Sequence, residues 1–210
     1  MNSITQENVR QLLGAITQAF EAHKDELCAF DRAIGDGDHG ESMARGTKAG
    51  LEAAGALTEG ASVYDCFKAY SRAMLASIGG AIGPIFSTVV SELGKAARDS
   101  GELGAGEYAA GLKNAADKVM ALGGAAPGDK TLVDALVPAA KAAADAGEAT
   151  LGQIAQAAAK AAGEGVKATI PMQAKMGRSH FLREKSVGHQ DAGATSLHLM
   201  LQTISDFVNA

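Results

Sequence analysis

Hydrophobic positions recur with helical spacing along almost the whole chain. The first such stripe is Val9, Leu12, Leu13, Ile16 and Phe20, and a repeat of three and four positions places such side chains on one face of a helix. Further stripes with the same spacing begin near His39, Val63, Ile85, Tyr108, Leu132, Leu151 and Thr195. Runs of alternating branched residues and hairpin turn pairs are missing. The pattern predicts an all-α protein with about eight helices, in an antiparallel barrel or bundle that forms a single domain over residues 1–210.

Several helix ends can be placed from short-range signals. Ser62 with Asp65, and Thr131 with Asp134, have the spacing of a capping box ahead of a hydrophobic run. Pro138 lies inside the helix that Thr131 would open, and it should kink that helix or mark an irregular turn.

Composition narrows the class of protein. Hydrophobic residues make up 47% of the 210 positions, and the formal net charge is −5. This acidic balance argues against a nucleic-acid partner, which would need a basic face. No apolar run reaches the ~20 residues of a membrane span, and the first residues lack a basic leader region. With Cys28 and Cys66 interpreted as free thiols, we expect a soluble cytoplasmic protein.

Four irregular segments combine glycine with charge or proline. They cover residues 31–40, 79–84, 123–131 and 177–193. In an up-and-down array, loops that follow every second helix lie at the same end. We therefore expect these four segments to surround a single pocket.

The first segment places Asp31, Asp36 and Asp38 within eight positions. Carboxylates held this close repel one another, and a bound cation removes the conflict. An EF-hand opening at Asp36 would put Glu41 where glycine is needed and Thr47 where glutamate is needed. Zinc would call for His and Cys ligands, so the set suits Mg²⁺ with room for phosphate oxygens. The alternative is a polar loop whose aspartates cap the next helix.

Two other features suit phosphate. The turn His39–Ser42 and the glycine loop Gly79–Pro84 can offer backbone N–H groups at a helix start, although neither matches a Walker loop. Arg178 could bind phosphate or form a salt bridge, and Lys130 and Lys175 share this ambiguity. No nucleophilic constellation is evident, which is compatible with phosphoryl transfer because that reaction needs positioning and charge neutralisation.

Together, the four segments resemble the L subunit of dihydroxyacetone kinase over nearly the whole chain. The carrying motifs are DRAIGDGDHG at 31–40, GGAIGP at 79–84, PGDKT at 127–131 and the stretch from Thr169 to Ser196. The resemblance implies an eight-helix antiparallel barrel with a nucleotide site at one end, and ADP or ATP with Mg²⁺ as cofactors.

The resemblance also implies a role for particular residues. Metal binding falls to Asp31, Asp36 and Asp38. Arg178 is the expected catalytic residue, because it would neutralise phosphate charge. The expected nucleotide-binding residues are His39, Gly40, Glu41, Ser42, Ala81, Ile82, Gly123, Leu132, Arg178, Asp191, Ala192 and Gly193.

The implied partners follow from the same resemblance. A separate K subunit would hold dihydroxyacetone, and the chain would supply the phosphoryl group. In the phosphotransferase-system version, bound ADP is a coenzyme recharged by a phosphorylated M subunit; in the other version, ATP exchanges with solution. A different small ketose or polyol as acceptor stays open. So does a regulatory module that holds ADP and docks on a transcription regulator, while a purely structural helical protein would leave the clustered aspartates unexplained.

Overall fold

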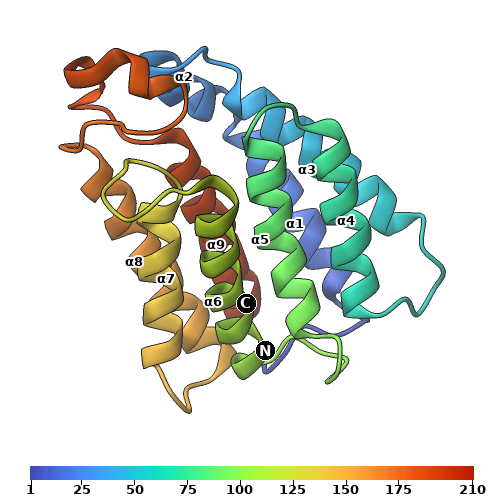
Figure 1. Ribbon diagram of the computed structural model, residues 1–210. Helices are drawn as coiled ribbons and strands as arrows, with labels where there is room; N and C mark the ends of the chain where they lie inside the picture. Colours follow the sequence, from blue (N-terminus) through green and yellow to red (C-terminus); the bar gives the residue numbers. More distant parts are fainter.

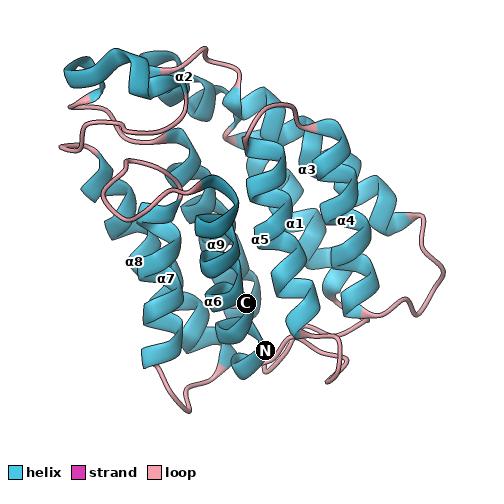
Figure 2. Cartoon of the chain, in the orientation of Figure 1, coloured by secondary structure: helices cyan, strands magenta, loops and turns pink.

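The chain is almost entirely helical. The computed structural model describes residues 1–210, in which no strand forms and only an isolated bridge joins Ile4 to Leu103 (Figure 2). This confirms the all-α prediction. The helices are α1 (Val9–Ala22), α2 (Lys24–Ile34), α3 (His39–Gly55), α4 (Val63–Ser77), α5 (Ile82–Ala96), α6 (Ala105–Gly123), α7 (Val133–Asp145), α8 (Leu151–Thr169), the 3₁₀ helix η1 (Arg178–Ser186) and α9 (Ala192–Asn209).

Eight of these helices form a closed ring. From α3 to α9 each helix packs on the next, and α1 closes the ring by packing on both α3 and α9 (Figure 1). The predicted eight-helix barrel is therefore present. One further α-helix, α2, lies outside the ring and was not predicted. It contacts α3, α9 and η1 at the end of the ring. Its signal is weak because Leu27, Cys28 and Ile34 are its only buried residues.

The core is continuous and rich in small side chains. A single cluster of 46 buried residues includes alanines along the facing sides of α7 and α8, where small side chains let two helices approach closely. Both cysteines are buried and free, as predicted. No helix combines the length and the apolar composition that a membrane span requires.

The predicted helix ends are largely correct. Ser62 caps α4, since its Oγ accepts the N–H of Asp65 at 3.1 Å. At the start of α7, the Asp134 carboxylate accepts the N–H of Thr131 at 2.7 Å, but the N-cap is Leu132, one residue later than predicted, and it makes no side-chain capping hydrogen bond. Pro138 does not end its helix, because α7 continues through it to Asp145.

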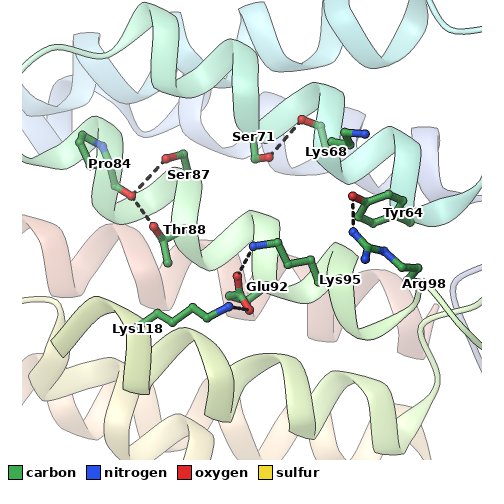
Figure 3. A network of polar contacts seen from close by, with 10 residues as sticks. All are labelled: Tyr64, Lys68, Ser71, Pro84, Ser87, Thr88, Glu92, Lys95, Arg98 and Lys118. Carbon is green, nitrogen blue, oxygen red and sulfur yellow. Dashed lines mark hydrogen bonds and ion pairs between the residues drawn. The ribbon is translucent and has the colours of Figure 1, made fainter. Parts of the chain in front are cut away.

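A buried carboxylate joins α5 to α6 on the flank of the ring. Glu92 is 3% exposed, and its two oxygens accept hydrogen bonds from Lys95 at 2.6 Å and from Lys118 at 2.7 Å (Figure 3). Burial by itself would raise the pKa of Glu92, but the hydrogen bonds from Lys118 and Lys95 outweigh it and leave that pKa below its usual value.

The four irregular segments lie at the same end of the ring, as predicted. The links α2–α3, α4–α5, α6–α7 and α8–α9 all lie at the upper end in Figure 1, with α2 and η1 beside them. The helices α3, α5, α7 and α9 begin at this end, so their N-termini, which carry partial positive charge, point toward it.

Candidate functional site

Three aspartates meet in the link between α2 and α3. Asp31 belongs to the last turn of α2, Asp36 to the link, and Asp38 immediately precedes α3. One carboxylate oxygen from each lies within 4.8 Å of the others. The turn is held by Asp31, whose Oδ2 accepts the N–H groups of Gly37 at 2.7 Å and Asp38 at 3.1 Å, while Gly37 takes a positive φ of 81°. Because the Asp38 side chain makes no capping hydrogen bond to α3, helix capping does not explain the cluster.

Arg178 brings the only positive charge paired with this cluster. It is the first residue of η1, and its guanidinium forms an ion pair with Asp36. The Arg178 side chain is 68% exposed, so it can exchange one anionic partner for another at little cost. One cation against three carboxylates leaves the cluster with excess negative charge.

The four residues expected to contact phosphate lie in the first turn of α3, and two of them are packed inward while two face outward. His39 is buried, with its Nε2 at 2.7 Å from Ser196 Oγ on α9, and burial lowers its pKa to about 4 despite the nearby Asp31 carboxylate. Gly40 packs against α2, where a Cβ would come 1.9 Å from the Lys24 carbonyl oxygen. These two residues therefore fix the turn by packing.

The other two residues of the turn face outward. Ser42 Oγ accepts a hydrogen bond from Arg45 at 3.2 Å. Glu41 lines a groove of about 500 Å³ on the flank of α3, together with Lys24, Lys48 and other charged side chains. Glu41 therefore lies beside the acidic link, by which we mean the link between α2 and α3 with its three aspartates, rather than inside it.

The remaining expected nucleotide contacts surround the same end. Ala81 and Ile82 open α5, and Gly123 is the exposed last residue of α6. Leu132 is buried, and a Cβ on Gly193 would lie 3.7 Å from its Cβ. The start of α7 and the first turn of α9 are therefore in contact, and the structure brings all the predicted segments to one end.

Comparison with known proteins gives a family for this arrangement. The model of the DAK2 domain matches residues 33–206, which is most of the chain. The ADP-binding subunit DhaL of the PEP-dependent dihydroxyacetone kinase of Escherichia coli is 33% identical over 205 residues, covering 97% of both chains. The chain belongs to the DAK2 domain family.

Other relatives of this DAK2 domain are longer. D-erythrulose kinase of Mycolicibacterium smegmatis is 38% identical over 203 residues, which cover 95% of this chain but 35% of that kinase. The dihydroxyacetone kinase of C. freundii has the same fold: its native crystal structure gives a TM-score of 0.73 at 20% identity, with 99% of this chain and 36% of that chain covered. Its complex with AMP-PNP and Mg²⁺ gives a TM-score of 0.71 at 22% identity, with 95% and 33% covered.

In this DAK2 domain, a second carboxylate group lies behind the acidic link. Asp191 caps α9 by accepting the N–H of Ala194 at 2.7 Å, and Ala192 beside it is buried. Burial raises the pKa of Asp191 to about 6; the carboxylates of Asp134 and Asp31 add to the shift, while the Ala194 N–H and the Lys130 ammonium oppose it. Negative charge therefore accumulates at this end of the domain.

The two ambiguous lysines have different partners. Lys175 forms an ion pair with Asp129 at 3.0 Å, while Lys130 is buried and its ammonium contacts only carbonyl oxygens. Thr169 and Ser196, the two ends of a motif that carries the resemblance, were given no role from the sequence. In the structure Ser196 is the partner of His39, and Thr169 Oγ1 accepts the N–H of Asp191 at 3.0 Å. The sequence alone does not identify the partner of such a hydroxyl.

Proposed function

We propose that the chain is the nucleotide- and Mg²⁺-binding subunit of a dihydroxyacetone kinase. It would transfer a phosphoryl group from bound nucleotide to dihydroxyacetone held on a separate K subunit. Family membership supports the reaction class, and the E. coli relative matched over nearly its full length is named as an ADP-binding subunit.

The observation that carries the proposal is the cluster of three carboxylates. Opposite ligands of an octahedral Mg²⁺ ion are about 4.2 Å apart, because each lies about 2.1 Å from the metal. The Asp31, Asp36 and Asp38 oxygens lie within 4.8 Å of one another, so small side-chain rotations would suffice for them to share an ion. Such an ion would supply charge neutralisation for the phosphates. A kinase of the same fold was crystallised with AMP-PNP and Mg²⁺.

The chain's own groups would do the rest of the binding. The N-termini of α3, α5, α7 and α9 point toward this end, and free N–H groups with the helix dipole attract phosphate. Arg178 can leave Asp36 and pair with phosphate oxygens, where its planar guanidinium gives two hydrogen bonds. Ala81, Ile82, Gly123 and the Leu132–Gly193 contact would form the walls around the nucleotide.

The donor is best assigned to the phosphotransferase system. Full-length relatives are named as PEP- or PTS-dependent subunits in E. coli and Lactococcus lactis, so bound ADP would be recharged by a phosphorylated M subunit. The 38% identity to D-erythrulose kinase makes an ATP-dependent kinase of a four-carbon ketose the second candidate. Docking on a transcription regulator stays a prediction.

A reconstituted assay tests the proposal. The chain is mixed with a dihydroxyacetone-binding K subunit and Mg²⁺, with either a phosphorylated M subunit or ATP as donor and dihydroxyacetone or erythrulose as acceptor. We expect dihydroxyacetone phosphate to form with the M subunit, and Asp36→Asn to abolish it. Asp117→Asn, on the exposed surface of α6, is the matched control and should stay active. Failure of every donor and acceptor pair, with a K subunit shown to be competent, would contradict the proposal.

A further inference from the structure

Lys130 is the most deeply buried cation of the chain. It is 1% exposed, although lysine is almost never fully buried. Its backbone also takes a positive φ of 60°, which is unfavourable for a residue with a Cβ. Residues in such conformations persist where the surrounding structure requires them, often at functional sites.

The Lys130 ammonium is surrounded by carbonyl oxygens. Its Nζ donates to the carbonyl of Thr169 at 2.7 Å and of Met172 at 3.1 Å, and also to the carbonyl of His189. An ammonium has three N–H donors, so each has an acceptor. Thr169 is the last residue of α8, where the helix dipole concentrates negative charge. The arrangement resembles a carbonyl cage around a monovalent cation, with the lysine supplying the cation.

Two of these carbonyls, those of Met172 and His189, belong to the two ends of one segment, and Thr169 directly precedes it. Residues 170–191 leave α8, pass through η1 and lead into α9. Met172 lies near the start of this segment and His189 near its end, where the Gly188 N–H also donates to the Ile170 carbonyl at 2.8 Å. Between these ends the segment carries Arg178, which pairs with Asp36 in the acidic link. The Lys130 ammonium thus closes the base of the segment that brings Arg178 to the aspartates.

We propose that Lys130 is a positioning residue whose ammonium gathers these three carbonyls and so holds the 170–191 segment over the acidic link. Asp191 and Asp134 lie near enough for their charges to favour the ammonium form against burial, but every direct hydrogen bond of the Lys130 ammonium goes to a carbonyl of this cage. The role of Lys130 in ordering the segment does not depend on the proposed function. Only an effect of that order on nucleotide binding rests on the proposed function.

The test combines substitution with rescue by small cations. Lys130→Ala leaves the three carbonyls without a donor and opens a cavity at the base of the segment. Hydrogen exchange is followed by mass spectrometry on the full chain, in K⁺, methylammonium and choline chloride at equal ionic strength. We expect exchange in 170–177 and 187–191 to be about tenfold faster or more in choline, since hydrogen bonds to a charged group are the stronger kind. Methylammonium or K⁺ should restore protection, because each fits among three carbonyls and choline does not.

Two further variants separate positioning from packing. Lys130→Met keeps most of the side-chain volume without the charge, and should lose protection in the same two stretches while α4 and α5 keep theirs. Lys175→Ala removes an exposed ion pair and should leave the exchange at 187–191 unchanged.

Three results would overturn the proposal: unchanged exchange of the segment in Lys130→Met, rescue of Lys130→Ala by choline as well as by methylammonium, or no rescue by any cation. If Lys130→Ala does not fold, the Lys130→Met comparison decides alone. ADP affinity is measured on the same proteins, and it tests whether the order of the segment affects nucleotide binding. Faster exchange with no ADP binding even in the unsubstituted chain would contradict the proposed function and leave the positioning role standing.

Discussion

Two acidic sites of this chain show opposite solutions to the same electrostatic problem. On the flank of the ring, the single carboxylate of Glu92 is buried and holds two lysine ammoniums within 2.7 Å. At the loop end, Asp31, Asp36 and Asp38 place three carboxylates within 4.8 Å and pair with one arginine. The Glu92 site has two positive charges for one negative charge, whereas the aspartate site has one positive charge for three negative charges.

This difference separates a structural acid from a candidate binding site. Each oxygen of Glu92 accepts a hydrogen bond from one lysine, so its negative charge is already balanced within the chain. The aspartates repel one another, and an external cation would relieve that repulsion.

The largest effect should come from Asp31→Asn. It removes one of the three carboxylates while keeping an oxygen that can accept the Gly37 N–H. We expect the affinity for ADP in Mg²⁺ to fall by about 100-fold or more, because changing a residue that only supports a metal ligand already costs roughly 10–100-fold. The free energy of unfolding without nucleotide should stay level or rise, because repulsion in the turn is relieved.

Calorimetric titration and urea unfolding measure the two quantities. Asp117→Asn serves again as the control on a distant surface. An Asp31→Asn protein that binds ADP as tightly as the unsubstituted chain would remove the distinction between the two acidic sites.

Glu92→Gln should lower the free energy of unfolding and leave ADP affinity unchanged, and its effect should be smaller than that of Asp31→Asn. Because both lysines are about half-exposed and can turn to water, the cost should be about 1–2 kcal/mol of unfolding free energy, with ADP affinity unchanged. The lowered pKa of Glu92 means that this contribution is present above the usual carboxyl range and is lost as the pH falls through the folded-state pKa. Urea unfolding at neutral and acid pH measures both effects, and a variant with undiminished stability would show that the ion pairs contribute nothing.

The pH dependence of stability that Asp191 sets gives a third test. Its pKa is raised from 3.8 to about 6, so the folded state retains a proton that the unfolded state has released. This component of the unfolding free energy therefore falls as the pH rises from about 4 to about 6. Asp191→Asn keeps an oxygen for capping α9 and should lack this component.

The difference between the two proteins isolates the Asp191 contribution. His39, with its pKa lowered to about 4, adds an opposite slope over the same range in both. Urea unfolding of nucleotide-free protein at several pH values gives the curves, and parallel curves would mean that the Asp191 carboxyl is not perturbed.

The sequence predicted the ring because helical periodicity is a local property. Stripes such as Val9 to Phe20 and caps such as Ser62 follow from spacing within a few residues. The helix α2 was missed because its three buried positions form no long stripe. Pro138 does not end α7, which continues to Asp145, and the expected kink at this position stays a prediction.

The candidate site could be predicted in part. The three aspartates lie within eight positions of the chain, so their cluster could be predicted from the sequence. Chain order indicated that the four segments share one end. The packing roles of His39 and Gly40 depend on contacts with α9 and α2, far away in the sequence or on an unpredicted helix. The carbonyl partners of Lys130 are likewise backbone groups, which leave no trace in side-chain chemistry.

Titration of ADP into the unsubstituted chain, with Mg²⁺ and then with a chelator in place of Mg²⁺, is the most direct measurement. If the three aspartates hold a metal that in turn holds the phosphates, binding should be tight with Mg²⁺ and weaker by about 100-fold or more without it, since disturbing only the residues behind a metal's ligands costs up to roughly 100-fold. Equal affinity under the two conditions would contradict the assignment of the acidic link as a metal site.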